Sequence, residues 1–242
     1  MMSSYRVTLL NARKVYSRCA NKVEQSIKAQ GLTTYLSNQV IGIGVAREWV
    51  RRAAEMDNIH YMGENLNNSK RNDLFIELLR FNFSWFAINA IFTRNDLLSL
   101  FGTPSGHGED SKFFLLYTNA VPPNETARLQ ELHLLLNTQI TTRLPNTHNH
   151  SVSTIKAIHL KYLPDNIPGR TAKAIKEAAE AGNANSLNMP TLLYGFRNWS
   201  VHGNALHGCF GSRPRFLKYT SLLQETLADV HYGTATKLMS LL

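Results

Sequence analysis

The residues best suited to chemistry gather in one apolar stretch, YGFRNWSVHG, where an arginine, an asparagine and a histidine stand among large hydrophobic side chains. In a helix, Asn198 and His202 are four residues apart and lie on one face. Arg197 lies about 140° around the axis from His202, so only its long side chain lets it reach the same patch. A cation, an amide and an imidazole can together bind a phosphate and move a proton. Metal-independent cleavage of an RNA phosphodiester needs these groups.

An arginine and a histidine at this spacing are weak evidence by themselves, because the spacing also arises by chance. Arg143 and His148 in RLPNTH have the same separation, but Pro145 and the polar surroundings exclude a helix that would present both. The motif at Arg197 differs by its adjacent asparagine and its apolar helical setting. The alternative interpretation is the polar face of an ordinary helix, with Arg197 paired to a carboxylate.

The elements that position this motif are predicted to be helices. Pro190 suits the first turn of a helix, and we expect a helix over 190–202. The strongest apolar periodicity predicts a central helix over 72–96, and a long amphipathic helix is expected over 215–241. These three helices are predicted to form the core of an all-α fold.

The rest of the chain is predicted to be mostly helical. Helical patterns also cover residues 7–30, 45–57 and 124–140, and an alanine-rich helix is expected over 170–182. Polar composition predicts loops over 102–111 and 141–151, and the pattern of 152–163 fits either a helix or a strand. We expect an N-terminal helical extension over 1–62 and a helical bundle domain over 63–242.

Composition and charge limit the class of protein. The 242 residues carry a net charge of +9, which favours an anionic partner, with nucleic acid first and a membrane surface second. Because 43% of the residues are hydrophobic, we expect a folded chain with a sizeable core. Two distant cysteines do not form a disulfide framework and fit a reducing cytoplasm. We expect a cytoplasmic protein with neither a membrane span nor a signal peptide.

Histidines outside the motif are weak candidates for metal binding. His107, His148 and His150 lie in polar segments and lack a third ligand at helical or turn spacing. The sequence also lacks the glycine-rich phosphate loop of nucleotide hydrolases. We therefore expect neither a metal ion nor a cofactor.

Two segments of the chain, in matching order, resemble the HEPN superfamily of small helical domains. RNWSVHG fits the R-N-x-x-x-H motif of that superfamily. The aromatic-rich string of its first core helix is matched by Phe81, Trp85, Ala87, Asn89 and Phe92. The resemblance covers roughly residues 70–240 and does not account for the N-terminal segment or for an insert over 102–150.

The resemblance implies an up-down helical bundle that forms a homodimer, with the motifs of both copies facing one cleft. It implies a metal-independent endoribonuclease of a toxin–antitoxin or phage-defence system, with an antitoxin or another defence protein as a partner. Arg197 and His202 would be catalytic, and Asn198 would support the active geometry. Asn89 is the candidate for a supporting polar residue in the first core helix; its alternative role is a core amide bonded to backbone or water.

Basic residues after the motif are candidates for RNA binding. Arg213, Arg215 and Lys218 follow the motif helix and could hold RNA phosphates, although a solvated face explains such charges equally well. His207 lies five residues beyond His202 and could line the cleft, or could be an ordinary surface histidine.

The main alternative function is a non-catalytic helical module that binds nucleic acid or a partner protein and regulates it. An intact R-N-x-x-x-H motif favours the enzyme, and cleavage of RNA is the observation that separates the two. A DNA-binding regulator is a weaker hypothesis, because no helix-turn-helix pair with a basic recognition helix is evident.

Overall fold

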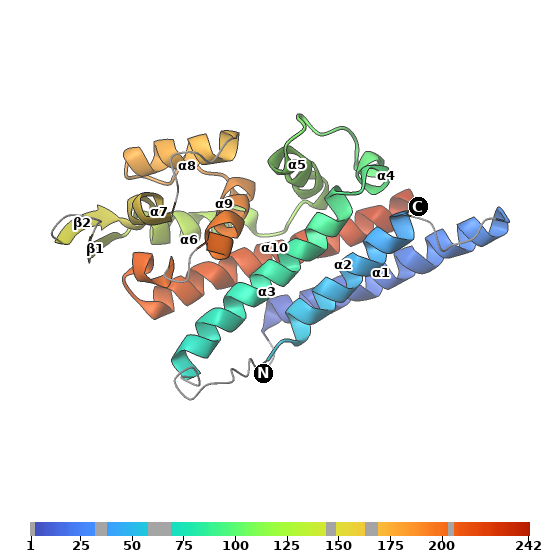
Figure 1. Cartoon of the computed structure of the whole chain (residues 1–242), viewed down its shortest axis with the longest axis horizontal. Coiled ribbons are helices and arrows are strands. Elements are labelled where there is room, and N and C mark those ends of the chain that lie inside the picture. The colour runs from blue at the N-terminus through green and yellow to red at the C-terminus, as the bar shows by residue number, and fades with distance from the viewer. Residues whose placement is uncertain (1–2, 32–37, 58–68, 144–148, 163–168, 203–205) are drawn as a thin grey trace. The chain divides into compact units, whose positions relative to one another are not determined.

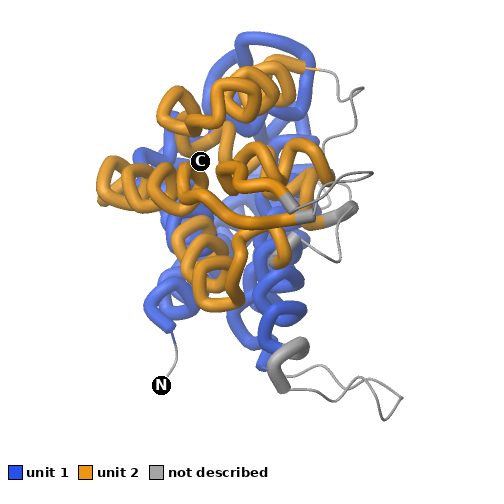
Figure 2. Tube along the Cα trace, turned by 90° about the vertical axis from the view of Figure 1, so that its left-hand side faces the viewer, with its two compact units in different colours: residues 1–123, 224–242 blue, residues 124–223 orange. Residues whose placement is uncertain are grey.

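A computed structural model describes residues 3–31, 38–57, 69–143, 149–162, 169–202 and 206–242. The chain forms two compact units (Figure 2). Unit 1 comprises Met1–Pro123 and Gln224–Leu242, and unit 2 comprises Asn124–Leu223. In the described residues the fold is all-α apart from one two-stranded hairpin, which confirms the predicted class.

Unit 1 is a set of helices in which consecutive members pack together. Its elements are α1 (Ser4–Ala29), α2 (Asn38–Glu55), α3 (Ser69–Phe92), α4 (Asn95–Leu98), a 3₁₀ turn (Ser99–Phe101), α5 (Glu109–Ala120) and the later part of α10 (Arg213–Leu241). α2 runs back along α1, and α3 runs back along α2 (Figure 1). The long helices α1 and α2 therefore share a core with α3, while a domain boundary at residues 62 and 63 stays a prediction.

The core of unit 1 is centred on α3. Its largest fully buried side chains include Tyr16, Ile43, Phe81, Trp85, Phe92 and Phe113. The Trp85 and Phe113 rings lie 4.6 Å apart between centroids, which joins α3 to α5. α5 was not expected from the sequence, although Glu109 and Asp110 in its first turn suit the positive end of a helix dipole.

The apolar helix α3 requires one correction to the sequence analysis. Its stretch Asp73–Phe92 is long and apolar enough to cross a membrane by length and composition, contrary to the expectation that no run has this character. Phe81, Trp85, Ile88 and Phe92 are nevertheless buried within unit 1. These four side chains therefore belong to the core of unit 1.

Two arginines fix the C-terminal end of α2. Arg6 donates from Nε to the carbonyl of Ala54, and Arg80 donates from Nε to the carbonyl of Met56 at 2.9 Å. Carbonyl groups at a helix end lack intrahelical partners and carry partial negative charge, so cationic donors stabilise them. These positive charges serve the fold of unit 1.

Unit 2 combines short helices with the hairpin. Its elements are α6 (Glu125–Asn137), β1 (Gln139–Arg143), β2 (Asn149–Ser153), α7 (Thr154–Tyr162), α8 (Arg170–Glu180), α9 (Met189–His202), a 3₁₀ turn (Leu206–Phe210) and the first part of α10. Its core is aromatic: Phe210 lies 4.8 Å from Tyr219 and 5.4 Å from Phe216 between ring centroids. The predicted helices over 170–182, 190–202 and 215–241 are confirmed as α8, α9 and α10.

The hairpin corrects the loop expected over 141–151. β1 and β2 are antiparallel, with Ile140 opposite Val152 and Thr142 opposite His150. Ile140 and Thr142 are buried, whereas Thr141 and Ser151 face solvent. Threonine and isoleucine favour a pleated strand, but serine, asparagine and histidine hide the alternation that would have indicated β2. The ambiguous stretch 152–163 begins in β2 and continues as α7.

Candidate active site in helix α9

Local contacts in unit 2 determine where α9 begins. His133 of α6 donates from Nε2 to the carbonyl of Leu187 at 2.7 Å. Asn137 accepts the backbone N–H of Ala184 at 2.7 Å on its side-chain oxygen. Asn188 then accepts the backbone N–H of Thr191 at 3.0 Å, which caps the first turn. α6 thus holds the segment that leads into the motif helix.

The apolar face of α9 packs closely against α8. Leu192, Leu193, Phe196 and Trp199 are completely buried. A Cβ atom at Gly195 would lie 2.6 Å from Cδ1 of Ile175, so the two helices approach each other more closely than a larger residue permits. This packing fixes the rotation of α9 and therefore the face that carries the motif.

Arg197 and Asn198 interact directly. Nη1 of Arg197 donates to Oδ1 of Asn198 at 2.8 Å, and both side chains are half-buried. The hydroxyl of Ser200 donates to the carbonyl of Arg197 at 2.9 Å. A guanidinium carries its N–H donors in a rigid fork, so the bond to Asn198 orients the whole group. The pair can present a cation in a defined direction, as phosphate binding requires.

His202 is the last residue of α9, four residues after Asn198. Its helical backbone places it on the face of Asn198, while its side chain lies outside the described residues, as does Gly203. The C-terminal end of a helix carries partial negative charge, which favours cationic side chains such as Arg197 and a protonated histidine. His207 belongs to the following 3₁₀ turn, and its side chain is also outside the described residues.

The three basic residues at the start of α10 have different surroundings. Arg215 donates to the carbonyls of Phe210 at 2.6 Å and Leu135 at 3.0 Å, and to Oγ1 of Thr154 at 3.2 Å. Burial lowers the pKa of this guanidinium from its ordinary value. Arg215 therefore ties α6, β2–α7 and α10 together within unit 2, a role that the sequence did not indicate.

Of the other two basic residues at the start of α10, Lys218 is exposed and Arg213 is half-buried. Lys218 forms an ion pair with Glu131 at 2.8 Å, with both side chains about half exposed. Arg213 is half-buried at the first residue of the helix. Phosphate binding by these two side chains stays a prediction.

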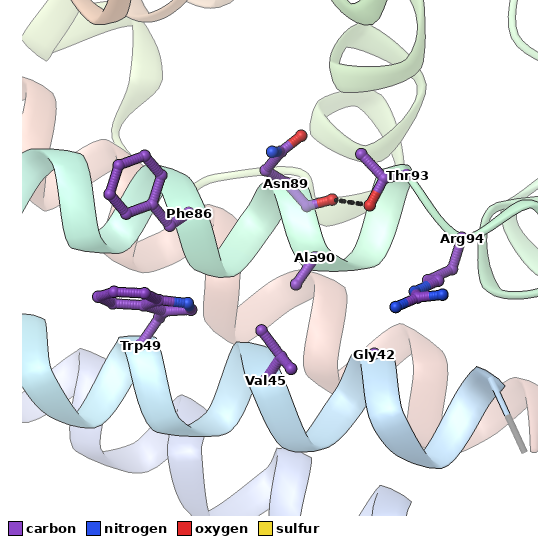
Figure 3. A pocket seen from close by; sticks show the side chains of 8 residues that line it. All are labelled: Gly42, Val45, Trp49, Phe86, Asn89, Ala90, Thr93 and Arg94. Carbon is purple, nitrogen blue, oxygen red and sulfur yellow. Dashed lines mark hydrogen bonds between the residues drawn. The ribbon is translucent and has the colours of Figure 1, made fainter. Parts of the chain in front are cut away.

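Asn89 belongs to unit 1 and lines a groove between α2 and α3. The remaining lining residues are Gly42, Val45, Trp49, Phe86, Ala90, Thr93 and Arg94 (Figure 3). The amide oxygen of Asn89 is shut off from solvent and accepts no hydrogen bond from the part of the chain that the structure describes. This groove was not predicted from the sequence. The available signal was that Trp49 and Arg52, and likewise Phe83 and Phe86, are three residues apart and so share one face of a helix.

Metal-binding groups do not gather in the described parts of the chain. No three His, Cys, Asp or Glu side chains there come together as a metal site requires. His107 and His150 are exposed, and His148 lies outside the described residues.

No family model, no curated protein and no solved structure matches this chain. The resemblance to HEPN domains therefore stays a prediction, and the proposed function is based on the residues of α9.

Proposed function

We propose that the protein is a metal-independent endoribonuclease whose active groups are Arg197, Asn198 and His202 at the C-terminal end of α9. The observation that carries the proposal is the hydrogen bond between Arg197 and Asn198 at 2.8 Å. It aims a guanidinium from the helix turn that also ends in His202. A cation and an imidazole on one helix end are the groups needed to hold a phosphate and to move a proton from the 2′-hydroxyl or to the 5′-oxygen beside it.

Each group has a defined step in the proposed reaction. His202 takes the proton from a ribose 2′-hydroxyl, and the 2′-oxygen then attacks the adjacent phosphorus. Arg197 stabilises the negative charge that develops on the phosphate oxygens, and Asn198 holds Arg197 in place. The bond to the 5′-oxygen breaks, which leaves a 2′,3′-cyclic phosphate on one product and a 5′-hydroxyl on the other.

A homodimer would supply the second proton carrier. In a shared cleft, His202 of one copy acts as the base, and the partner's His202 donates a proton to the departing 5′-oxygen. The two histidines then exchange protonation states, which balances the reaction without a metal ion. We place this enzyme in the cytoplasm, in a toxin–antitoxin or phage-defence system.

The distribution of charge supports RNA as the substrate of unit 2. Residues 124–223 contain 11 Lys and Arg against 5 Asp and Glu, which gives this unit +6 of the chain's net charge of +9. Residues 1–123 and 224–242 contain 15 against 12. Phosphate-rich ligands favour the more basic surface, and that surface belongs to the unit with the motif.

The test is RNA cleavage in EDTA by the purified protein and by its His202→Ala variant. We expect wild type to yield cyclic or 3′-phosphate ends and the variant to lose at least about a hundredfold in rate. His150→Ala is the matched control, because His150 is an exposed histidine of the same unit. Cleavage by His202→Ala at the wild-type rate, or loss of wild-type activity in EDTA, would overturn the mechanism.

The second candidate is a non-catalytic module that binds nucleic acid or a partner protein. The partly apolar groove between α2 and α3 favours it, because a binding surface in unit 1 does not require catalysis in unit 2. Absence of cleavage by wild type in the same experiment, across total RNA, would favour this module.

A further inference from the structure

We propose that the groove between α2 and α3 binds single-stranded RNA, with one base against Trp49 and Phe86 and the neighbouring phosphates on arginines of the rim. The inference rests on the proposed function for the identity of its ligand as RNA. It adds the class of substrate, a single strand, and a second binding surface in unit 1.

The groove has the size and lining of a ligand site. Its cavity is about 310 Å³, with Val45 and Ala90 between the two helices and the ring of Trp49 at one end (Figure 3). Arg94 lies at the other end of the same groove. An apolar cleft with a few polar groups at its edges is typical of small-ligand and base-binding sites.

The aromatic end of the groove is accessible to solvent. Phe86 is 41% exposed and Val45 is 40% exposed, although both have large apolar side chains. Trp49 lies 5.3 Å from Phe86 and 5.1 Å from Phe83 between ring centroids. The other two tryptophans, Trp85 and Trp199, are buried. Partly exposed rings beside cations are the stacking platforms of proteins that bind single strands.

The rim of the groove is positively charged. Arg52 lies over the Trp49 ring at 4.7 Å, and Arg94 reaches the side-chain oxygen of Asn38 at 3.4 Å. Arg47 and Arg51, which do not line the groove, pair with Glu48 and Glu55 on α2.

The positive charge of the groove favours an anionic partner. Arg52 and Arg94 give the groove a positive charge, and none of the described residues that line it is acidic, so it attracts a polyanion and repels a second copy of the same face. Arg52 lies over Trp49 at one end of the groove and Arg94 lies at the other end, so a strand along the groove would place phosphates near both.

The ligand of this groove must offer a base that is free to leave its stack. A duplex keeps its bases stacked inside, so only a single strand can insert one.

The test measures binding without cleavage, in the His202→Ala background with EDTA. The probe is a fluorescein-labelled single-stranded RNA of about ten nucleotides, read by anisotropy at low salt. Two groove changes are compared, Phe86→Leu, which removes the ring but keeps apolar surface, and Arg52→Gln. The matched controls are Phe75→Leu, 39% exposed on the same helix, and Arg18→Gln on the exposed face of α1.

We expect Phe86→Leu to weaken binding about tenfold and Arg52→Gln to reduce both affinity and its salt dependence, while each control stays within about twofold of the parent. Equal loss in the controls, no loss in the groove variants, or equally tight binding of the duplex would overturn the proposal. Competition by AMP at the concentrations at which the strand binds would assign the groove to a free nucleotide instead. Dimer dissociation caused by Phe86→Leu would assign it to a second copy.

The two proposals fail in different ways. Binding that depends on Phe86 without any cleavage by wild type would remove the nuclease and keep the groove. Cleavage by wild type with RNA binding that ignores Phe86 and Arg52 would keep the nuclease and remove the groove.

Discussion

Two apolar helices of this protein, α9 and the later part of α10, both carry polar side chains, but these polar groups have different partners. In α10, Nε2 of Gln224 donates to the carbonyl of Glu77 at 2.7 Å, and Nε2 of His231 bonds to the carbonyl of Ser84 at 2.8 Å. Both bonds reach the backbone of α3. In α9, Arg197 bonds to Asn198 of its own helix at 2.8 Å.

The partner of His231 determines its protonation. A carbonyl only accepts hydrogen bonds, so Nε2 carries the proton and Nδ1 accepts from the hydroxyl of Tyr16 at 3.4 Å. The ring is completely buried, and this burial lowers the pKa of His231 from 6.5 to about 4. A neutral histidine bonded on both sides acts as a structural link between α1, α3 and α10.

The comparison shows when a polar residue in an apolar helix indicates a site. Where a backbone carbonyl of another helix accepts a hydrogen bond from it, as with Gln224 and His231, it specifies packing. Where the side chains stay half-exposed, as with Arg197 and Asn198, the pair remains accessible to a ligand. The distinction depends on the partner and its location, which the residue type alone does not give.

The largest effect that tests this comparison is expected for Arg197→Lys. Lysine keeps the charge but loses the planar fork, so we expect the cleavage rate in EDTA to fall by about 10²–10³-fold. The free energy of unfolding measured in urea should change by less than about 0.5 kcal/mol, since the side chain is half-exposed. Arg128→Lys, half-buried in α6, is the control. If Arg197→Lys kept full activity, the planar fork of Arg197 would not be needed for cleavage, and Arg197 would be a structural residue like Gln224 and His231.

The dependence of the free energy of unfolding on pH tests whether His231 is neutral in the folded protein. Its pKa is lower in the folded protein than in the unfolded chain, so the unfolded chain binds the extra proton between pH 6.5 and about 4. The stability contribution is fully present above pH 6.5 and is lost as the pH falls toward 4, by about 3 kcal/mol. His231→Gln keeps an amide donor for Ser84 and should remove this part of the slope in urea titrations. Equal slopes in variant and wild type would contradict a buried neutral histidine.

Arg215 extends the comparison to the region after the motif. Arg215→Met leaves the carbonyls of Phe210 and Leu135 without their donor, and we expect about 2–3 kcal/mol less stability. Lys218→Met removes an exposed ion pair to Glu131 and should cost less than about 1 kcal/mol. Urea midpoints of the two variants measure the difference. Comparable losses would show that Arg215 is no more structural than Lys218.

The smallest effects are expected for two glycines of α2. A Cβ at Gly42 would meet Cδ1 of Leu97 at 2.7 Å and the carbonyl of Ala90 at 3.2 Å, so Gly42→Ala should destabilise the protein by about 1–2 kcal/mol. A Cβ at Gly44 meets nothing within 4 Å, and Gly44→Ala should stabilise it by about 0.5–1 kcal/mol. Thermal melts of the pair test the sign of each change. If both substitutions changed the stability in the same direction, the close neighbours of Gly42 would not explain the effect of Gly42→Ala.

Sequence reasoning succeeded where the signal is local. The helices α3, α8, α9 and α10 follow from apolar spacing and from the proline near the start of α9, because helical periodicity is a property of consecutive residues. The same geometry places Asn198 and His202 on one face. The strands Gln139–Arg143 and Asn149–Ser153 could not be predicted in this way, because five-residue strands rich in serine, threonine and asparagine carry little apolar alternation.

The sequence by itself determined that the chain is helical, basic and equipped with an arginine–asparagine–histidine motif near the end of one apolar helix. Tertiary structure decided which charges serve the fold and which face solvent. Arg215 contacts Leu135, eighty positions earlier, and Trp49 meets Phe86 across two helices. Such partners come together through packing between distant segments, so their roles depend on contacts that no local pattern of residues encodes.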